Sequence, residues 1–216
     1  MKKYKHIIWD WNGTIVNDRW LSVEVLNEIL RDFSLPAQSE EDYRENFSFP
    51  VIDYYRRLGF SVSKEKFDEI GQYFIRRFNA KRYECSLNEG ALELIQKISQ
   101  KDVPQSVLSA YEKNFLSEAL EHFGVKKYLS KFSGLSDVNA NTKLELGLKH
   151  VASLNLAPEE IIILGDTDHD YAVSQAAQTS CALVATGHQS ASRLKKTGAQ
   201  VFEKFADLED FLMQNL

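Results

Sequence analysis

Short, mostly apolar runs, each followed by a polar residue or a glycine, recur along much of the chain. Three of these runs are 7–9 before Asp10, 105–108 before Ser109, and 161–164 before Gly165 and Asp166. Runs of this length, bounded by turn-forming residues, are typical of buried strands. The segments 132–135, 181–185 and 200–202 show a similar pattern and predict three further strands.

Between these strands the apolar positions recur every three or four residues, which is the period of an amphipathic helix. Helices are expected over 89–100, 112–123, 144–154, 171–177, 190–197 and 207–213. Strands that alternate with helices favour a parallel sheet with helices on both of its faces. The sequence therefore predicts an α/β fold with a doubly wound parallel sheet.

The segment 16–82 departs from this alternation. Its apolar residues follow the helical period, and Ser39 and Ser63 stand where helix N-caps are expected. No part of it shows the pattern of a parallel-sheet strand. We therefore expect a small all-helical insertion directly after the first strand, with the α/β core formed by 1–15 and 83–216.

Composition and charge narrow the possible partners and locations. The 216 residues are 44% hydrophobic and carry a net charge of −5, which argues against broad nucleic-acid binding. The apolar runs fall far short of the ~20 residues of a membrane span, and the basic N-terminus lacks the apolar core of a signal peptide. Cys85 and Cys181 are expected to be reduced thiols. We expect a cytoplasmic protein that is a monomer or a weak dimer.

The polar residues that follow the strands are candidates for chemistry, because open parallel sheets bind ligands at the carboxyl ends of their strands. Asp10 is a candidate nucleophile, and Gly13 lets the backbone turn sharply behind it; the alternative is a structural aspartate that caps a turn. Ser109 offers a hydroxyl and Lys143 an ammonium group for phosphate oxygens. Together these groups suit phosphoryl transfer.

A cluster of acids follows the predicted strand at 161–164. Carboxylates crowded at a strand end repel one another unless a cation neutralises them, and oxygen ligands suit Mg²⁺. Asp166 and Asp170 stand about one helical turn apart and are expected to face the same way. Asp168, between them, is expected to be the N-cap of the following helix.

The order of Asp10, Ser109, Lys143 and the acidic cluster resembles that of the haloacid dehalogenase (HAD) superfamily. The nearest likeness is to its small-molecule phosphatases of the phosphoglycolate phosphatase type, and it covers essentially the whole chain. The resemblance implies that 16–82 is a small helical cap over a Rossmann-like core. It also implies a Mg²⁺-dependent phosphoric monoester hydrolase whose partner is a small phosphorylated metabolite.

The resemblance assigns the phosphoryl group to four residues. Asp10 would attack phosphorus and form an aspartyl-phosphate, which divides one difficult displacement into two easier steps. Ser109 and the backbone N–H of Ala110 would donate hydrogen bonds to phosphate oxygens. Lys143 would stabilise the transferring group, with Lys149 as the alternative cation.

The resemblance also implies a metal site and a cap contact. Mg²⁺ would be held by Asp10 and Asp166 together with the backbone carbonyl of Asn12, and Asp170 would orient or supplement these ligands. In the predicted cap, Arg44 is a candidate for pairing with a second anionic group of the substrate.

Asn12 is the main departure from the family pattern. Phosphatases of this superfamily carry a second aspartate there, which protonates the leaving group and then activates water. An amide cannot transfer a proton, and a positioned general acid–base is worth about 10²–10⁴-fold in rate. His169 and His188 are candidate substitutes, because the pKa of histidine suits proton transfer near neutrality.

Two other functions stay open. Phosphonoacetaldehyde hydrolase shares the Asp-Trp-x-Gly-Thr signature and lacks the second aspartate, but it uses a cap lysine. Lys64, Lys66 and Lys81 lack the apolar surroundings that would lower the pKa of a lysine. The other possibility is a phosphate-binding or regulatory protein whose turnover is impaired by Asn12. Haloacid dehalogenases need no Mg²⁺, so the acidic cluster counts against them.

Overall fold

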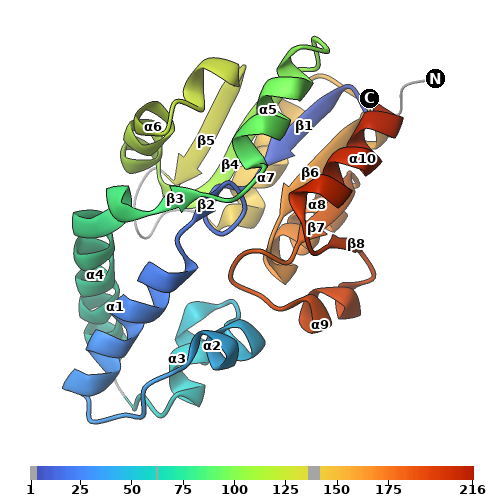
Figure 1. Ribbon diagram of the computed structural model, residues 1–216. Coiled ribbons are helices and arrows are strands. Elements are labelled where there is room, and N and C mark those ends of the chain that lie inside the picture. The colour runs from blue at the N-terminus through green and yellow to red at the C-terminus, as the bar shows by residue number, and fades with distance from the viewer. Residues whose placement is uncertain (1–3, 62, 136–141) are drawn as a thin grey trace.

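The computed structural model describes residues 4–61, 63–135 and 142–216 (Figure 1). Its core is a six-stranded sheet in the order β5-β4-β1-β6-β7-β8, and every neighbouring pair of strands is parallel. The strands are β1 (His6–Trp9), β4 (Gln105–Glu112), β5 (Lys131–Leu135), β6 (Ile161–Gly165), β7 (Ser180–Val184) and β8 (Gln200–Phe202). The strand β1 is thus central, with β4 on one side and β6 on the other.

Helices cover both faces of the sheet, as the two clusters of buried side chains show. One face packs against α5 (Ala91–Ser99), α6 (Lys113–His122) and α10 (Phe205–Asn215), and the other against α7 (Lys143–Ala152) and α8 (Asp168–Ala177). In Figure 1, α5 and α10 lie in front of the sheet and α7 and α8 behind it. The predicted doubly wound α/β fold is therefore confirmed.

The apolar run of β1 is continuous because both faces of this strand are buried. Ile7 and Trp9 join the cluster on the α5 side, and Ile8 joins the cluster on the α7 side. All three side chains are fully buried, and burial of each contributes about 1.5–3 kcal/mol. This packing fixes the end of β1, where Asp10 follows.

Three elements differ from their predicted ranges by more than two residues at one end. The strand β4 continues past Ser109 to Glu112, with a shift in its register against β5. The helix α8 begins at Asp168, and its N-cap is Thr167, whose hydroxyl accepts from the backbone N–H of Asp170. The prediction of Asp168 as the N-cap was therefore wrong. The segment predicted as one helix over 190–197 is α9 (Ala191–Leu194) followed by a 3₁₀ turn.

Four helices occupy the segment after β1. They are α1 (Arg19–Asp32), α2 (Glu40–Asn46), α3 (Val51–Arg57) and α4 (Lys64–Lys81). Ser39 and Ser63 cap α2 and α4 by accepting from backbone N–H groups, as predicted. A two-stranded antiparallel pair, β2 (Val16–Asn17) with β3 (Ser86–Leu87), joins this segment to the core.

Figure 1 shows α1–α4 beyond the carboxyl end of β1, while the start of β1 and the end of α10 lie at the opposite end of the sheet. The helical segment therefore lies against the edge of the sheet at which the predicted site residues lie.

In the described part of the chain no helix is both long and apolar enough to cross a membrane.

Candidate active site

Asp10 lies directly after β1, at the centre of the sheet's carboxyl edge. Its backbone N–H donates to the carbonyl of Leu164 in β6 at 2.8 Å, which continues the parallel pairing by one residue. One carboxylate oxygen accepts from the ammonium of Lys143, and the other accepts from the hydroxyl of Thr14 at 3.3 Å. Asp10 is buried, and Lys143 and Thr14 each bind one oxygen of its carboxylate.

Lys143 reaches Asp10 from the first turn of α7. Its ammonium also donates to Asp170 of α8, so that two carboxylates hold one cation. Burial opposes the charge of Lys143, but the two carboxylates outweigh it and raise the pKa of the lysine. The side chain is thus a fixed positive charge beside Asp10. Lys149, the alternative cation, is exposed on α7.

Asp10, Asp166 and Asp170 form a buried acidic cluster. One ligand oxygen from each lies within 4.8 Å of the others. Burial raises the pKa of Asp10 well above its usual range, and burial together with the nearby Asp170 raises the pKa of Asp166 to about 6. Burial also acts on Asp170, yet the charge and hydrogen bond of Lys143 and the hydroxyl of Thr167 lower its pKa.

Two glycines make room for Asp166. A Cβ on Gly13 would lie 2.3 Å from an oxygen of Asp166, and one on Gly187 would lie 2.1 Å from the same oxygen. Gly13 also has φ +76°, which other residues rarely adopt. That oxygen accepts from the backbone N–H of His188 at 2.6 Å, while Thr14 donates to the other at 2.9 Å. Thr14 therefore bridges Asp10 and Asp166.

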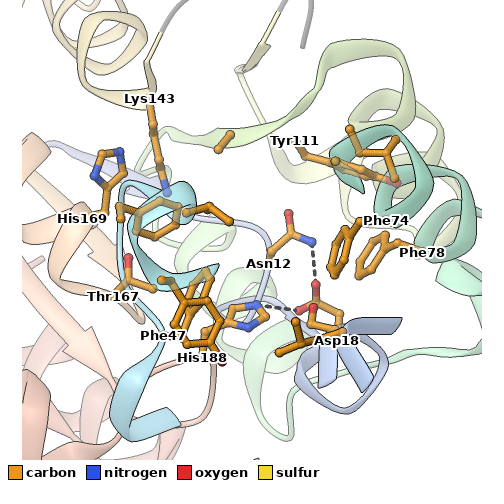
Figure 2. Close-up of a pocket in the computed structure, with 18 of the residues that line it drawn as sticks. Asn12, Asp18, Phe47, Phe74, Phe78, Tyr111, Lys143, Thr167, His169 and His188 are labelled. Atoms are coloured by element: carbon orange, nitrogen blue, oxygen red, sulfur yellow. Dashed lines mark hydrogen bonds and ion pairs between the residues drawn. The ribbon is translucent and has the colours of Figure 1, made fainter. Parts of the chain in front are cut away.

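Asn12 belongs to a second polar network (Figure 2). Its amide donates to Asp18 at 2.7 Å, and the other oxygen of Asp18 accepts from the backbone N–H of Gly13 at 2.7 Å. His188 Nε2 lies 3.4 Å from Asp18, and Tyr43 pairs with the other ring nitrogen of His188. Burial opposes a charge on His188, but Asp18 and the neighbouring carboxylates raise its pKa to about 9.

Ser109 lies on β4, facing Asn12. Its hydroxyl donates to the amide oxygen of Asn12 at 3.4 Å and accepts from the backbone N–H of Tyr111 at 3.0 Å. Ala110 follows and is exposed. Both line the same cavity as Asp10 and Lys143. The structure thus brings together the residues that the sequence assigned to the phosphoryl group.

This active-site cavity has a volume of about 460 Å³ and lies between the core and helices α1–α4. Its floor is formed by residues after the strands, among them Asp10 and Asp166. Its opposite wall comes from the helical segment and includes Phe74 and Phe78 of α4, which Figure 2 shows across from Asn12. A ligand in it would touch both parts of the molecule.

Arg44 and Asp168 have partners that the sequence did not predict, whereas His169 lies in the cavity. The guanidinium of Arg44 donates to the carbonyls of Ala185 and Gln189 at 2.7 and 3.4 Å, and Arg44 is not among the lining residues that are described. Asp168 pairs with Arg193 at 2.8 Å. His169 lines the cavity and stacks on Phe49, with 4.7 Å between ring centroids.

Two lining residues carry no sequence signal that would have assigned them. Asp18 belongs to none of the motifs, yet it is the partner of Asn12. Tyr43 belongs to a helix without any motif, and its contact with His188 spans 145 residues. Only the fold brings such groups together.

The cap lysines Lys66 and Lys81 pair with Glu69 and Glu24 on the helical segment itself.

The model of the haloacid dehalogenase-like hydrolase family matches residues 7–184. The chain is 24% identical over 212 residues to the pyrophosphatase PpaX of Listeria welshimeri, with 95% of each chain covered. Its structure resembles that of a predicted phosphatase from Clostridium acetobutylicum with a TM-score of 0.84, at 20% identity over 98% of this chain and 99% of the other. A predicted phosphoglycolate phosphatase from Haemophilus somnus gives 0.78, at 17% identity over 98% and 99%.

The family match covers most of the sequence, and the structural matches cover nearly all of it. The chain therefore belongs to the haloacid dehalogenase-like hydrolase family, as its motifs indicated. The likeness to the solved structures shows a shared fold.

Proposed function

We propose that this protein is a Mg²⁺-dependent phosphatase that acts on a small phosphorylated metabolite through an aspartyl-phosphate on Asp10. The observation that carries this proposal is the meeting of Asp10, Ser109 and Lys143 on the floor of one cavity, beside Asp166 and Asp170. Hydrolysis of acetyl phosphate and of a panel of phosphoesters, with and without Mg²⁺, tests it directly.

In the proposed reaction an oxygen of the Asp10 carboxylate attacks phosphorus while the bond to the leaving group breaks. The hydroxyl of Ser109 and the N–H of Ala110 donate to phosphoryl oxygens, and the ammonium of Lys143 stabilises their charge. Water then attacks the aspartyl-phosphate, which releases phosphate and restores Asp10. Asn12 can orient groups here by hydrogen bonding, but its amide supplies no proton.

The acidic cluster fits a divalent cation. Three buried carboxylates face the single positive charge of Lys143, and oxygen ligands are those that Mg²⁺ prefers. Asp10, Asp166 and the carbonyl of Asn12 would hold the ion, and Asp170 would orient or supplement them. When bound, Mg²⁺ supplies positive charge that stabilises the developing charge of the phosphoryl group.

Binding of Mg²⁺ should be measurable without any substrate. At a concentration 100-fold above Kd, a ligand stabilises the folded state by about 2.7 kcal/mol, which corresponds to roughly 5–10 °C in Tm for a chain of this size. We expect this shift in the natural protein and its near-complete loss in Asp166→Asn. The amide keeps the size of Asp166 and one acceptor but removes the charge.

Thermal unfolding over a Mg²⁺ titration, with K⁺ added to match ionic strength, checks this prediction. Asp168→Asn is the matched control, because that carboxylate pairs with Arg193 instead of joining the cluster. Turnover that persists in EDTA, or an equal shift in Asp166→Asn, would contradict the metal assignment.

We also propose that α1–α4 form a cap that closes over the floor and excludes water. Arg44 supports this role, because it joins α2 to the carbonyls of Ala185 and Gln189 in the core. A hydrogen bond to a charged group contributes about 1.5–3 kcal/mol. Arg44→Ala should therefore favour the open cap by about 10- to 100-fold, raise KM and speed amide exchange in α2.

Arg57→Ala is the control for this prediction. The guanidinium of Arg57 donates to the carbonyl of Asn46 and to Ser48, both within the helical segment, so its loss leaves the contacts with the core intact. Equal exchange rates and equal KM values in the two variants would argue against a closing role for Arg44.

The second candidate is a phosphate-binding protein without useful turnover, which Asn12 favours. It predicts that phosphate or vanadate binds while acetyl phosphate, whose leaving group needs no proton, is still not hydrolysed.

The cytoplasmic location and the monomeric or weakly dimeric state stay predictions.

A further inference from the structure

The wall of the active-site cavity opposite Asp10 is formed almost entirely by apolar side chains. Aromatic rings dominate it, among them Phe47, Phe49, Phe67, Phe74 and Phe78. Phe47 and Phe49 meet edge to face at 5.2 Å, and Phe49 stacks on His169. Such rings favour an aromatic guest in stacked or edge-to-face contact.

The cavity lining offers a second anionic group no cation that lacks a carboxylate partner. Of the lining residues that are described, the cations are Lys143, which is held between Asp10 and Asp170, and His188, whose Nε2 lies beside Asp18. Two cations of the helical segment bind groups outside the cavity lining: Arg44 binds core carbonyls and Arg77 binds Glu28. A carboxylate or second phosphate against the apolar wall would be desolvated without a free cation to pair with it.

The volume of the cavity also bears on the ligand. About 460 Å³ falls within the range of about 300–1,000 Å³ that is usual for sites of organic ligands. It exceeds what a phosphate with a two-carbon acid or a second phosphate would fill. A phosphate joined to one or two aromatic rings matches both its size and its lining.

Asn12 points to the same class by an independent route. Because residue 12 has no carboxyl group, it supplies no proton to the leaving group of the substrate. A phenol has a pKa of about 10, as in tyrosine. An alcohol has a pKa close to that of water, about 15.7. A phenolate is therefore a far better leaving group than an alkoxide.

We infer that the substrate is an aryl phosphate monoester whose aromatic group packs against the apolar wall; this inference rests on the proposed phosphatase function. The Asp10 carboxylate forms a bond to phosphorus as the bond between phosphorus and the aryl oxygen breaks. The electron pair leaves on the aryl oxide, which takes a proton from solvent. Water then cleaves the aspartyl-phosphate to inorganic phosphate and Asp10.

Three comparisons of kcat/KM test the inference. 1-Naphthyl phosphate should exceed 2-phosphoglycolate and pyrophosphate by at least about tenfold, the lower limit of what a single methylene can give in an apolar pocket. It should also exceed 1-naphthylmethyl phosphate, which carries the same rings on an alkoxide leaving group. Acetyl phosphate, which needs neither rings nor a proton, reports whether phosphoryl transfer occurs at all.

Gly71 allows a substitution that fills the cavity. It lines the cavity from α4, and a Cβ built on it meets no atom within 4 Å. Gly71→Leu should lower kcat/KM for 1-naphthyl phosphate by about tenfold or more, and by more than it lowers that for acetyl phosphate. Gln72→Leu is the control, because it adds the same side chain at the next, exposed position of α4.

The outcomes distinguish the aryl phosphate inference from the proposed phosphatase function on which it rests. If acetyl phosphate is hydrolysed but 2-phosphoglycolate or pyrophosphate matches 1-naphthyl phosphate, the aryl inference is overturned and the phosphatase stands. Equal rates on the naphthyl and naphthylmethyl esters would likewise overturn the aryl leaving group. If no compound is hydrolysed, the phosphatase and the inference fall together.

Discussion

Asp10→Asn is expected to reduce turnover to background, because the amide cannot attack phosphorus. Loss of a nucleophile from a catalytic unit lowers kcat on the order of 10⁶-fold. The fold should survive, since an asparagine oxygen can still accept from Lys143 or from Thr14, and the buried strand before it is unchanged. Steady-state rates on acetyl phosphate, with circular dichroism as a check on folding, measure both effects.

Asp102→Asn is a matched control for this loss. Asp102 is exposed and has φ +56°, a conformation that asparagine accepts readily, so its rate should equal that of the natural protein. Intact mass after rapid mixing and acid quenching should show one added phosphoryl group in the natural protein and none in Asp10→Asn. Near-normal turnover by Asp10→Asn would remove the basis of the proposed mechanism.

The elements of the core could be predicted because each follows from a local pattern. The buried run 7–9 ends where β1 ends, and β8 lies where the last short run was expected. The pair β2 and β3 was not predicted, since two residues per strand carry no usable period. Thr167 was not predicted as the N-cap of α8, because the side chain of the neighbouring Asp168 is an equally good N-cap.

The candidate site was predictable to the extent that it follows the strands. Asp10, Ser109 and Asp166 meet because parallel strands end at one edge of the sheet. Asp18 could not be assigned as the partner of Asn12, because its contact depends on the turn after Asp10. Arg44 looked free to bind an anion, since its bonds to core carbonyls appear only once the helical segment is placed.

Asn12→Asp is expected to give the largest gain in activity. The structure shows how the new carboxyl would be tuned, since the amide of Asn12 lies 2.7 Å from a carboxylate oxygen of Asp18. Two carboxyl groups at that distance share a proton, because both cannot easily be ionised together. The higher of the two pKa values of the pair should therefore rise, and a protonated carboxyl is what the leaving group needs. On alkyl phosphates the gain should approach about 10²–10⁴-fold.

The double variant Asn12→Asp with Asp18→Asn sharpens this prediction. It restores one amide and one carboxyl group with their positions exchanged, and the oxygen of the new asparagine can still accept from the backbone N–H of Gly13. It removes the neighbouring negative charge, so the carboxyl at position 12 should titrate at lower pH than in the single variant. The optimum for alkyl phosphates should shift in the same direction.

Single-turnover phosphorylation rates on naphthylmethyl phosphate and acetyl phosphate measure the effect. The alkyl ester should gain strongly and acetyl phosphate little in this step, because its leaving group needs no proton. Hydrolysis of the aspartyl-phosphate should also speed up, because the new carboxyl can activate water, so kcat alone would mix two effects. Affinity for Mg²⁺ must be followed in parallel, since the added charge can also strengthen metal binding. If no phosphoester gains, either another group transfers the proton or phosphate esters are the wrong substrates, and the binding-protein candidate then takes precedence.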